Sequence, residues 1–202
     1  MSGDQSGEGA SWEKYANNLV VSYIEVANRD PKLIWHKQTL HWIMAPYLAE
    51  DRFCLLLSKD ARSWERFQDI SLPGVRECPD FFTLTDESGD EQLVFWGTKR
   101  RYLPGKFDGL AFECRSELQT AESGRDGYAA QKYSNAPDGI TIQISWMSGG
   151  RYPEMPYNQQ MSVPMELKLA GSGQQSSLAR VPVRELETLR TRPSVVKRRG
   201  NP

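Results

Sequence analysis

The feature that most constrains the fold of this chain is the recurrence of short apolar runs, rich in aromatic and β-branched residues, at roughly ten-residue spacing. One group of four runs follows Asn28-Arg29-Asp30-Pro31, and a second follows Glu77-Cys78-Pro79-Asp80. The predicted strands are residues 32–36, 41–45, 52–58 and 63–67 in the first group, and 81–84, 92–96, 101–105 and 106–112 in the second. Four-stranded units that repeat about every 45 to 50 residues are typical of a β-propeller, although a β-sandwich also fits this periodicity.

The rest of the sequence adds a third group and a different ending. Residues 128–133 and 140–147 are joined by Ala136-Pro137-Asp138-Gly139, a hairpin turn in which Gly139 takes a positive φ without steric cost. Two weaker runs, 11–15 and 19–24, are also predicted strands, and helical spacing predicts a short helix over 182–190. We therefore expect a flexible lead over 1–10, a β domain over 11–170, and a linker with a C-terminal tail over 171–202.

The composition excludes several classes of partner. The 202 residues carry 25 Lys and Arg against 26 Asp and Glu, so no net basic field would attract nucleic acid. No apolar stretch reaches membrane-spanning length, and no signal peptide is recognised, which leaves the localisation open. The three cysteines lie far apart, and His36 and His41 have no partner at metal-ligand spacing. Since there is no glycine-rich phosphate loop either, no cofactor is expected.

Two acidic residues stand where the first two strand groups begin: Asp30, directly before a proline, and Glu77, two positions before another. A retaining glycosidase needs a carboxylate nucleophile and an acid/base carboxyl about 5 to 5.5 Å apart, and neighbouring β units can supply such a pair. Burial would raise the pKa of Glu77 and suit it to the acid role, whereas Asp30, beside Arg29, would stay ionised and accept hydrogen bonds from sugar hydroxyls. In a chain with 26 Asp and Glu most carboxylates are solvated, so neither residue is convincing alone.

Several short motifs occur in one consistent order along the chain. They are Asn-Arg-Asp-Pro-Lys at 28–32 with Trp35-His36, Trp64-Glu65, Glu-Cys-Pro-Asp-Phe-Phe at 77–82, Gly-Lys-Phe-Asp-Gly at 105–109, Tyr-Ala-Ala-Gln at 128–131, Ala-Pro-Asp-Gly at 136–139, Trp-Met-Ser at 146–148, and residues 158–167. Each motif is weak by itself. Together, over residues 11–190, they resemble glycoside hydrolase family 32, the family of levanases, inulinases, fructanases and invertases.

The resemblance implies an all-β fold, a five-bladed β-propeller whose central funnel binds β-D-fructofuranosides and hydrolyses them with retention. The implied substrate is a fructan such as levan or inulin, or sucrose. By motif, Asp30 would be the transition-state stabiliser that binds fructosyl hydroxyls, with Arg29 beside it, and Glu77 the general acid/base. Cys78 would support Glu77 from the next position, and Trp146 would line the fructose subsite.

The sequence also departs from this family. Its members open with a first blade that carries a Trp-Met-Asn-Asp-Pro-Asn-Gly-like motif, whose aspartate is the nucleophile, whereas the one Asp-Pro here is Asp30-Pro31. The C-terminal β-sandwich that usually follows the propeller has no counterpart either. We therefore expect a fragment of about blades two to five, with no nucleophile of its own and negligible hydrolysis alone. The alternatives are a non-catalytic fructan-binding module and a propeller used for protein contacts.

Overall fold

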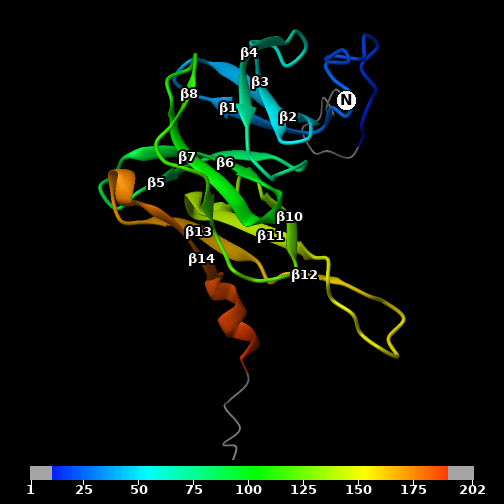
Figure 1. Cartoon of the computed structure of the whole chain (residues 1–202), viewed down its shortest axis with the longest axis vertical. Coiled ribbons are helices and arrows are strands. Elements are labelled where there is room, and N and C mark those ends of the chain that lie inside the picture. The colour runs from blue at the N-terminus through cyan, green and yellow to red at the C-terminus, as the bar shows by residue number, and fades with distance from the viewer. Residues whose placement is uncertain (1–10, 191–202) are drawn as a thin grey trace, which may run out of the picture.

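The computed structural model of the chain describes residues 11–190, whose strands form three antiparallel sheets (Figure 1). The first sheet runs in chain order through β1 (Arg29–His36), β2 (His41–Ala49), β3 (Arg52–Ser58) and β4 (Glu65–Ser71). The second contains β5 (Asp80–Thr85), β6 (Glu91–Gly97), β7 (Arg101–Phe107) and β8 (Phe112–Cys114), with β9 (Gln119–Thr120) also paired to β7. The third contains β10 (Gly127–Lys132), β11 (Thr141–Met147), β13 (Met165–Ala170) and β14 (Ser177–Pro182), with β12 (Gln160–Met161) paired to β11.

The three sheets lie in layers, with the second sheet between the other two (Figure 1). The first strand of the second sheet, β5, contacts the first strands of both neighbours, β1 and β10. Meanders that pack face to face around their first strands are the blades of a β-propeller. Residues 11–190 contain three sheets, whereas four blades were predicted. The difference arises after the second sheet, where residues from Gly127 to Pro182 form a single sheet with a long loop between β11 and β12.

The middle sheet is apolar on both faces. Phe81 on β5 and Phe95 on β6 face the first sheet; their ring centroids lie 5.6 Å apart, and that of Phe95 lies 5.4 Å from Phe53 on β3. Phe82 and Trp96, one position further along the same strands, face the third sheet. Successive side chains of a strand point to opposite faces of the sheet. Two aromatic residues that are neighbours in the sequence therefore place one ring against the first sheet and the other against the third sheet.

Most predicted strands are confirmed to within a few residues, and β3 has the predicted bounds. The predictions for 11–15 and 19–24 are wrong, because these segments form no strand of a sheet and contain only an isolated bridge at Glu13. The apolar residues of the second segment are used for packing instead. Val21 and Ile24 lie against a cluster on the first sheet, formed by Met44, Leu48, Cys54 and Leu56.

The turns explain the remaining differences. Gly139 has a φ of 69° in the 3-10 turn η2 (Pro137–Gly139), as predicted for that hairpin. The predicted strand over 106–112 is wrong, because β7 continues two residues past its predicted end and β8 begins only at Phe112. Between them lies a turn in which Asp108 Oδ1 accepts a 2.7 Å hydrogen bond from the backbone N–H of Leu110. The predicted linker after 170 is a turn inside the third sheet, where η3 (Gly173–Gln175) joins β13 to β14.

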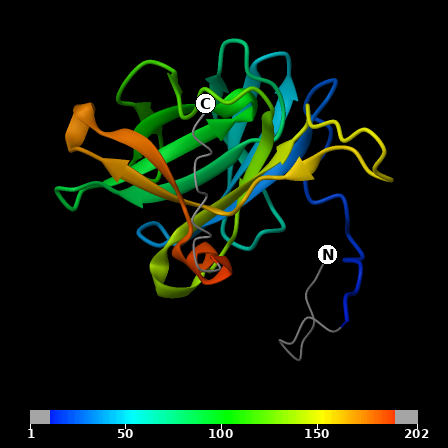
Figure 2. The same ribbon diagram turned by 90° about the horizontal axis from the view of Figure 1, so that it is seen from below.

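Two short 3-10 helices complete the described chain. η1 (Thr98–Arg100) joins β6 to β7, and η4 (Arg184–Leu189) lies within the range of the predicted helix and follows the third sheet (Figure 2). The predicted lead over 1–10 and residues 191–202 of the predicted tail lie outside the described residues. Among the helices of residues 11–190, none is long and apolar enough to cross a membrane.

Candidate functional site

Four of the predicted site residues, Arg29, Asp30, Glu77 and Cys78, lie at or just before the first strands of the first and second sheets, and the backbone at the start of the first strand of each sheet is irregular. Asp30, Glu77 and Ala129 have φ values of 52°, 50° and 47°, in the left-handed region that residues other than glycine rarely adopt. The pairing register of β1 with β2, and of β10 with β11, shifts next to these positions. Bulges of this kind re-aim side chains and are frequent beside binding sites.

Glu77 lies between a cation and a phenol. Arg29 Nη2 donates to its Oε2 over 2.7 Å, and the Tyr128 hydroxyl donates to its Oε1 over 2.5 Å. The Arg29 hydrogen bond, followed by that of Tyr128, lowers the pKa of Glu77, and burial opposes this shift more weakly. The prediction of a raised pKa for Glu77 is therefore wrong, because the two hydrogen bonds outweigh burial, and the carboxyl is ionised at neutral pH in this geometry.

Asp30 is held by the residue that follows Glu77 in the chain. Its Oδ2 accepts hydrogen bonds from the Cys78 backbone N–H at 3.1 Å and from the Cys78 thiol at 3.6 Å, and lies 3.6 Å from Arg29 Nε. Both Cys78 donors reach Oδ2, and the Asp30 side chain is 35% exposed, which leaves Oδ1 to accept from a ligand.

The thiol of Cys78 acts as a hydrogen-bond donor in this arrangement. Burial, with the charges of Asp30 and Glu77 adding to it, raises the pKa of Cys78 to about 12. The thiol therefore stays protonated, which disfavours a role as a thiolate nucleophile. The structure also places the side-chain contact of Cys78 on Asp30, whereas the sequence predicted support for Glu77.

A buried carboxylate connects the first strands of all three sheets. Asp80 on β5 is fully buried, and its Oδ1 lies 3.1 Å from Nζ of Lys32 on β1. Its Oδ2 accepts a 2.7 Å hydrogen bond from the backbone N–H of Lys132 on β10. Burial raises the pKa of Asp80, and the charge of Lys32 opposes that shift. One carboxylate thus bridges three blades.

Gln131 strengthens the same connection. Its Oε1 accepts from Lys32 Nζ at 3.1 Å, and its amide donates to the Pro79 carbonyl at 3.1 Å. Lys32 follows Asp30 by two residues, and Pro79 follows Glu77 by two. The contacts of Gln131 therefore set the spacing between the two strand ends that carry the candidate carboxylates.

Trp146, predicted to line a sugar subsite, lies on β11 next to Tyr128. Their ring centroids are 6.1 Å apart in an edge-to-face arrangement, and the indole Nε1 donates to Gln159 Oε1 over 2.8 Å. Trp146 is 38% exposed, and an exposed aromatic ring can stack on a sugar. Tyr128 touches both Trp146 and Glu77, so it links this ring to the carboxylates.

The structure brings Arg29, Asp30, Glu77 and Cys78 into direct contact with one another. Trp146 does not contact them directly but is linked to Glu77 through Tyr128. Sequence reasoning gave no role to Tyr128, to the buried Asp80, or to the partly buried residues around Asp80, which are Lys32, Gln131 and Lys132. One sequence signal could have indicated this set, namely a charged residue at the start of an otherwise apolar strand. Such a residue is expected to be buried with the strand, and a buried charge must be paired.

The arrangement suits recognition of a polyol and transfer of a proton. Ionised carboxylate oxygens accept hydroxyl hydrogen bonds, and Arg29 and Tyr128 donate nearby. In residues 11–190 no three His, Cys, Asp or Glu side chains come together in a way that would hold a metal ion.

Comparison with known proteins places this geometry in context. The family profile described as the glycosyl hydrolases family 32 N-terminal domain matches residues 2–182. The levanase of Bacillus subtilis (strain 168) is 31% identical over 210 residues, which cover 91% of this chain and 31% of the levanase. The extracellular exo-inulinase inuE of Meyerozyma guilliermondii is 28% identical over 183 residues, which cover 80% of this chain and 36% of the inulinase. The chain thus spans 31% and 36% of the length of these two relatives.

Solved structures share the same arrangement of sheets. The β-fructofuranosidase of Schwanniomyces occidentalis complexed with fructosyl-erythritol has a TM-score of 0.76 at 25% identity, and the match covers 87% of this chain and 39% of that one. The exo-inulinase of Aspergillus awamori has a TM-score of 0.74 at 22% identity and covers 87% and 41%. The three sheets described above are therefore a substructure that larger proteins contain.

Proposed function

The chain belongs to glycosyl hydrolase family 32, and from this premise we propose that it carries the sugar-binding and proton-transfer part of a glycosidase site for β-D-fructofuranosides. The main support is the convergence of Asp30, on β1, and Glu77, in the segment before β5, which both contact Arg29. Relatives named levanase and exo-inulinase favour a fructan as the substrate, and a solved relative complexed with fructosyl-erythritol favours the fructosyl group as the bound unit.

The proposed roles follow from the contacts. Asp30 accepts hydrogen bonds from adjacent fructosyl hydroxyls through Oδ1, while Cys78 holds its Oδ2. Its negative charge also stabilises an oxocarbenium-like transition state. Arg29 orients both carboxylates, and Trp146 provides an apolar face for the sugar ring.

Glu77 is proposed as the general acid/base, which requires its pKa to change during the reaction. A sugar that covers the carboxylates excludes water, and its hydroxyls compete for the Arg29 guanidinium. Both effects raise the pKa of Glu77, so that it can protonate the leaving oxygen. The ionised form then serves as the base in the second step.

A retaining mechanism also needs an attacking carboxylate, and in this proposal neither Asp30 nor Glu77 supplies it. We therefore expect the chain alone to bind fructosyl groups and to release negligible fructose from levan, inulin or sucrose. Measurable release of fructose by the purified chain would contradict that expectation.

The experiment that tests the proposal is calorimetric titration with fructose of the chain and of three variants. Asp30→Asn should weaken binding about tenfold, the equivalent of one charge-assisted hydrogen bond. Glu77→Gln should change the affinity by less than about threefold, because the acid acts mainly in the transition state. Asp138→Asn, whose side chain is 79% exposed on η2, is the control and should bind like the parent chain.

The alternatives predict different outcomes for the same variants. A propeller used only for protein contacts predicts no saturable binding of fructose by any form. Binding that survives in Asp30→Asn would place the sugar elsewhere and refute the proposed role of Asp30. Thermal melting of each variant shows that a loss of binding is not a loss of folding.

A further inference from the structure

A cavity of about 550 Å³ is lined by residues of all three sheets and lies apart from the candidate carboxylates. Trp35 on β1, Trp42 on β2 and Phe82 on β5 line it, and Lys132, the last residue of β10, lines it from the third sheet. At about 3.3 Å per residue of a strand, Trp35 lies roughly 15 Å from Asp30 along β1. The cavity is therefore distinct from the proposed fructosyl site.

The two tryptophans form an aromatic wall of this cavity. Their ring centroids lie 5.2 Å apart in an edge-to-face arrangement. Trp35 is 41% exposed, whereas Phe82 is buried in the core between the second and third sheets. An exposed indole that is supported by a second indole offers a surface on which a flat ring can stack.

Lys132 adds a positive charge that has no partner. The carboxylate of Asp80 is already used on both oxygens, since Oδ1 lies 3.1 Å from Lys32 Nζ and Oδ2 accepts from the backbone N–H of Lys132. Within residues 11–190, neither Lys132 nor Lys37, which also lines the cavity, forms an ion pair. Two ammonium groups, of Lys32 and Lys132, thus share one carboxylate, which leaves one positive charge in excess.

Burial makes this excess charge unfavourable. It lowers the pKa of Lys132; the charge of Asp80 opposes the shift, and the charge of Lys32 adds to it. A partly buried cation without a counter-charge costs free energy, which a bound anion would recover. The cavity therefore favours a ligand with a negative charge.

The rest of the lining narrows the class of anion. The uncharged polar residues are Thr83, Ser134, Asn135 and Thr141, which can donate to carboxylate oxygens. Among the residues of 11–190 that line the cavity, none is acidic and none is an arginine. Arginine is the side chain that holds phosphate in a bidentate manner, whereas lysine is a point charge, so the lining suits a carboxylate better than a phosphate.

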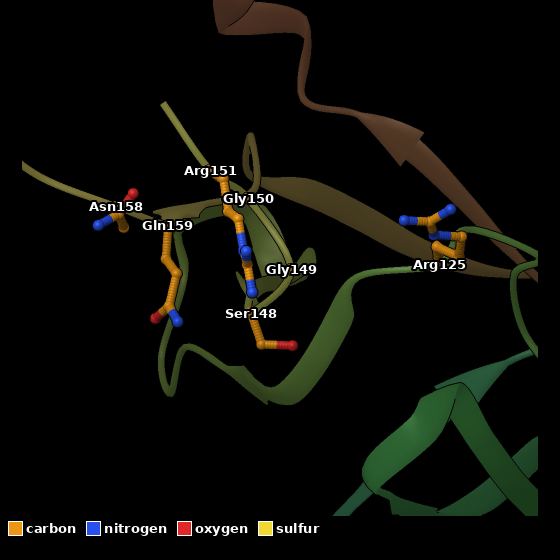
Figure 3. Close-up of a pocket in the computed structure, with 7 residues that line it drawn as sticks. All are labelled: Arg125, Ser148, Gly149, Gly150, Arg151, Asn158 and Gln159. Atoms are coloured by element: carbon orange, nitrogen blue, oxygen red, sulfur yellow. The ribbon is translucent and has the colours of Figure 1, made fainter. Parts of the chain in front are cut away.

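The cavity shown in Figure 3 offers charge without an aromatic wall. It has a volume of about 930 Å³ and lies at the loop between β11 and β12, with Arg125 on the side opposite the loop residues. Arg125 and Arg151 line it, but in the described part of the chain no aromatic side chain does. This cavity therefore provides the control for a ligand that needs both a cation and a ring.

We propose that the cavity lined by Trp35 and Lys132 binds a small aromatic carboxylate. Its ring stacks on Trp35, and its carboxylate pairs with the Lys132 ammonium group, so that one negative charge balances the excess at Asp80. The volume lies within the range of about 300 to 1,000 Å³ that is usual for small-molecule sites. This site goes beyond the proposed function and does not require a bound sugar.

The test is calorimetric titration of the whole purified chain with cinnamate, an aromatic carboxylate, and with cinnamamide, its neutral amide. The parent chain should bind cinnamate about tenfold more tightly, as expected for one charge-assisted hydrogen bond. Lys132→Met keeps the backbone contact with Asp80 and should remove this tenfold preference. Trp35→Leu keeps an apolar side chain and should weaken both ligands about fivefold through the loss of ring stacking. Arg125→Met, in the cavity of Figure 3, is the matched control and should bind both ligands like the parent chain.

The contrary outcomes each overturn the inference. Absence of saturable binding, or equal affinities of the parent chain for both ligands, shows that the cavity does not select an aromatic carboxylate, and this comparison needs no variant. Unchanged binding by Lys132→Met and Trp35→Leu places the ligand elsewhere. A loss of binding in Arg125→Met would assign cinnamate to the cavity of Figure 3, and competition by fructose would assign it to the site at Asp30. Inorganic phosphate that binds as tightly as cinnamate would show an anion site without a role for the ring. Thermal melting confirms that each variant is folded at the temperature of the titration.

Discussion

Asp80→Asn is the substitution that tests most sharply how the candidate site is held together. Asp80 is fully buried, and it bridges Lys32 on β1 and the backbone N–H of Lys132 on β10. Asparagine keeps the size of the side chain but removes its charge. Its NH₂ group would also face either Lys32 Nζ or the Lys132 N–H, and a donor that faces a donor forms no hydrogen bond. The change should therefore destabilise the fold and loosen the spacing of Asp30 and Glu77.

The magnitude can be estimated from these contacts. Removal of one partner of a buried ion pair costs about 3 to 5 kcal/mol in the free energy of unfolding. We expect the lower end, about 3 kcal/mol. One reason is that Lys32 Nζ keeps the oxygens of Gln131 and Lys132, at 3.1 and 3.5 Å. Another is that burial raises the pKa of Asp80, which shows that the buried charge is itself unfavourable.

The assay is urea unfolding followed by tryptophan fluorescence, combined with titration of fructose. For a chain of this size, a loss of about 3 kcal/mol lowers the urea midpoint by about 1 M. If the spacing of the site also changes, fructose should bind about tenfold more weakly, the equivalent of one lost hydrogen bond to Asp30.

Asp86→Asn is the matched control, because Asp86 follows the other end of β5 and is also buried. Its carboxylate accepts hydrogen bonds from the backbone N–H groups of Ser88, Asp90 and Gly173. This variant should lose stability and keep its affinity for fructose. The reasoning is refuted if Asp80→Asn keeps the parent affinity, or if both variants lose affinity equally.

Three further predictions concern titratable groups. Arg29→Gln should raise the pKa of Glu77 toward its ordinary value, as followed by carbon-13 NMR of the carboxyl, and an unchanged pKa would show that Arg29 is not the cause of the shift. At pH 8 iodoacetamide should modify the exposed Cys114 before Cys78, whose pKa is raised to about 12, and faster labelling of Cys78 would contradict its role as a protonated donor. The pKa of Asp86 is lowered, first by its hydrogen bond from the Ser88 side chain, so its stabilisation is present above the ordinary pKa of about 3.9 and is lost as the pH falls below it. Asp86→Asn should therefore unfold in urea with less pH dependence than the parent chain below about pH 4, and equal dependence would contradict the assignment.

Local patterns were enough to predict most of the fold. Alternating apolar residues and the Pro137-Asp138-Gly139 turn each act over a few residues, so they can be read from the sequence. The failed strand predictions at 11–15 and 19–24 have a different cause. A strand also needs a neighbouring edge to pair with, and Val21 and Ile24 pack on the outside of a sheet instead.

The sequence suggested only part of the candidate site, and it did not predict the electrostatics of that part. The motifs identified Arg29, Asp30 and Glu77, and adjacency in the chain paired Arg29 with Asp30. The stronger bond of Arg29, at 2.7 Å to Glu77, depends on how two sheets pack, which no local pattern describes. For the same reason burial alone gave the wrong direction for the pKa of Glu77, because the cation that outweighs burial comes from another sheet.

The most direct test of the central claim, that Asp30 and Glu77 form one fructosyl-binding site, is nitrogen-15 NMR of the labelled chain during titration with fructose. The backbone amide of Cys78 donates to Asp30 at 3.1 Å and follows Glu77 in the chain, so it reports on both carboxylates. We predict a saturable shift of this amide signal, which is absent in Asp30→Asn. A Cys78 signal that does not move, or that moves equally in Asp30→Asn, would contradict the claim.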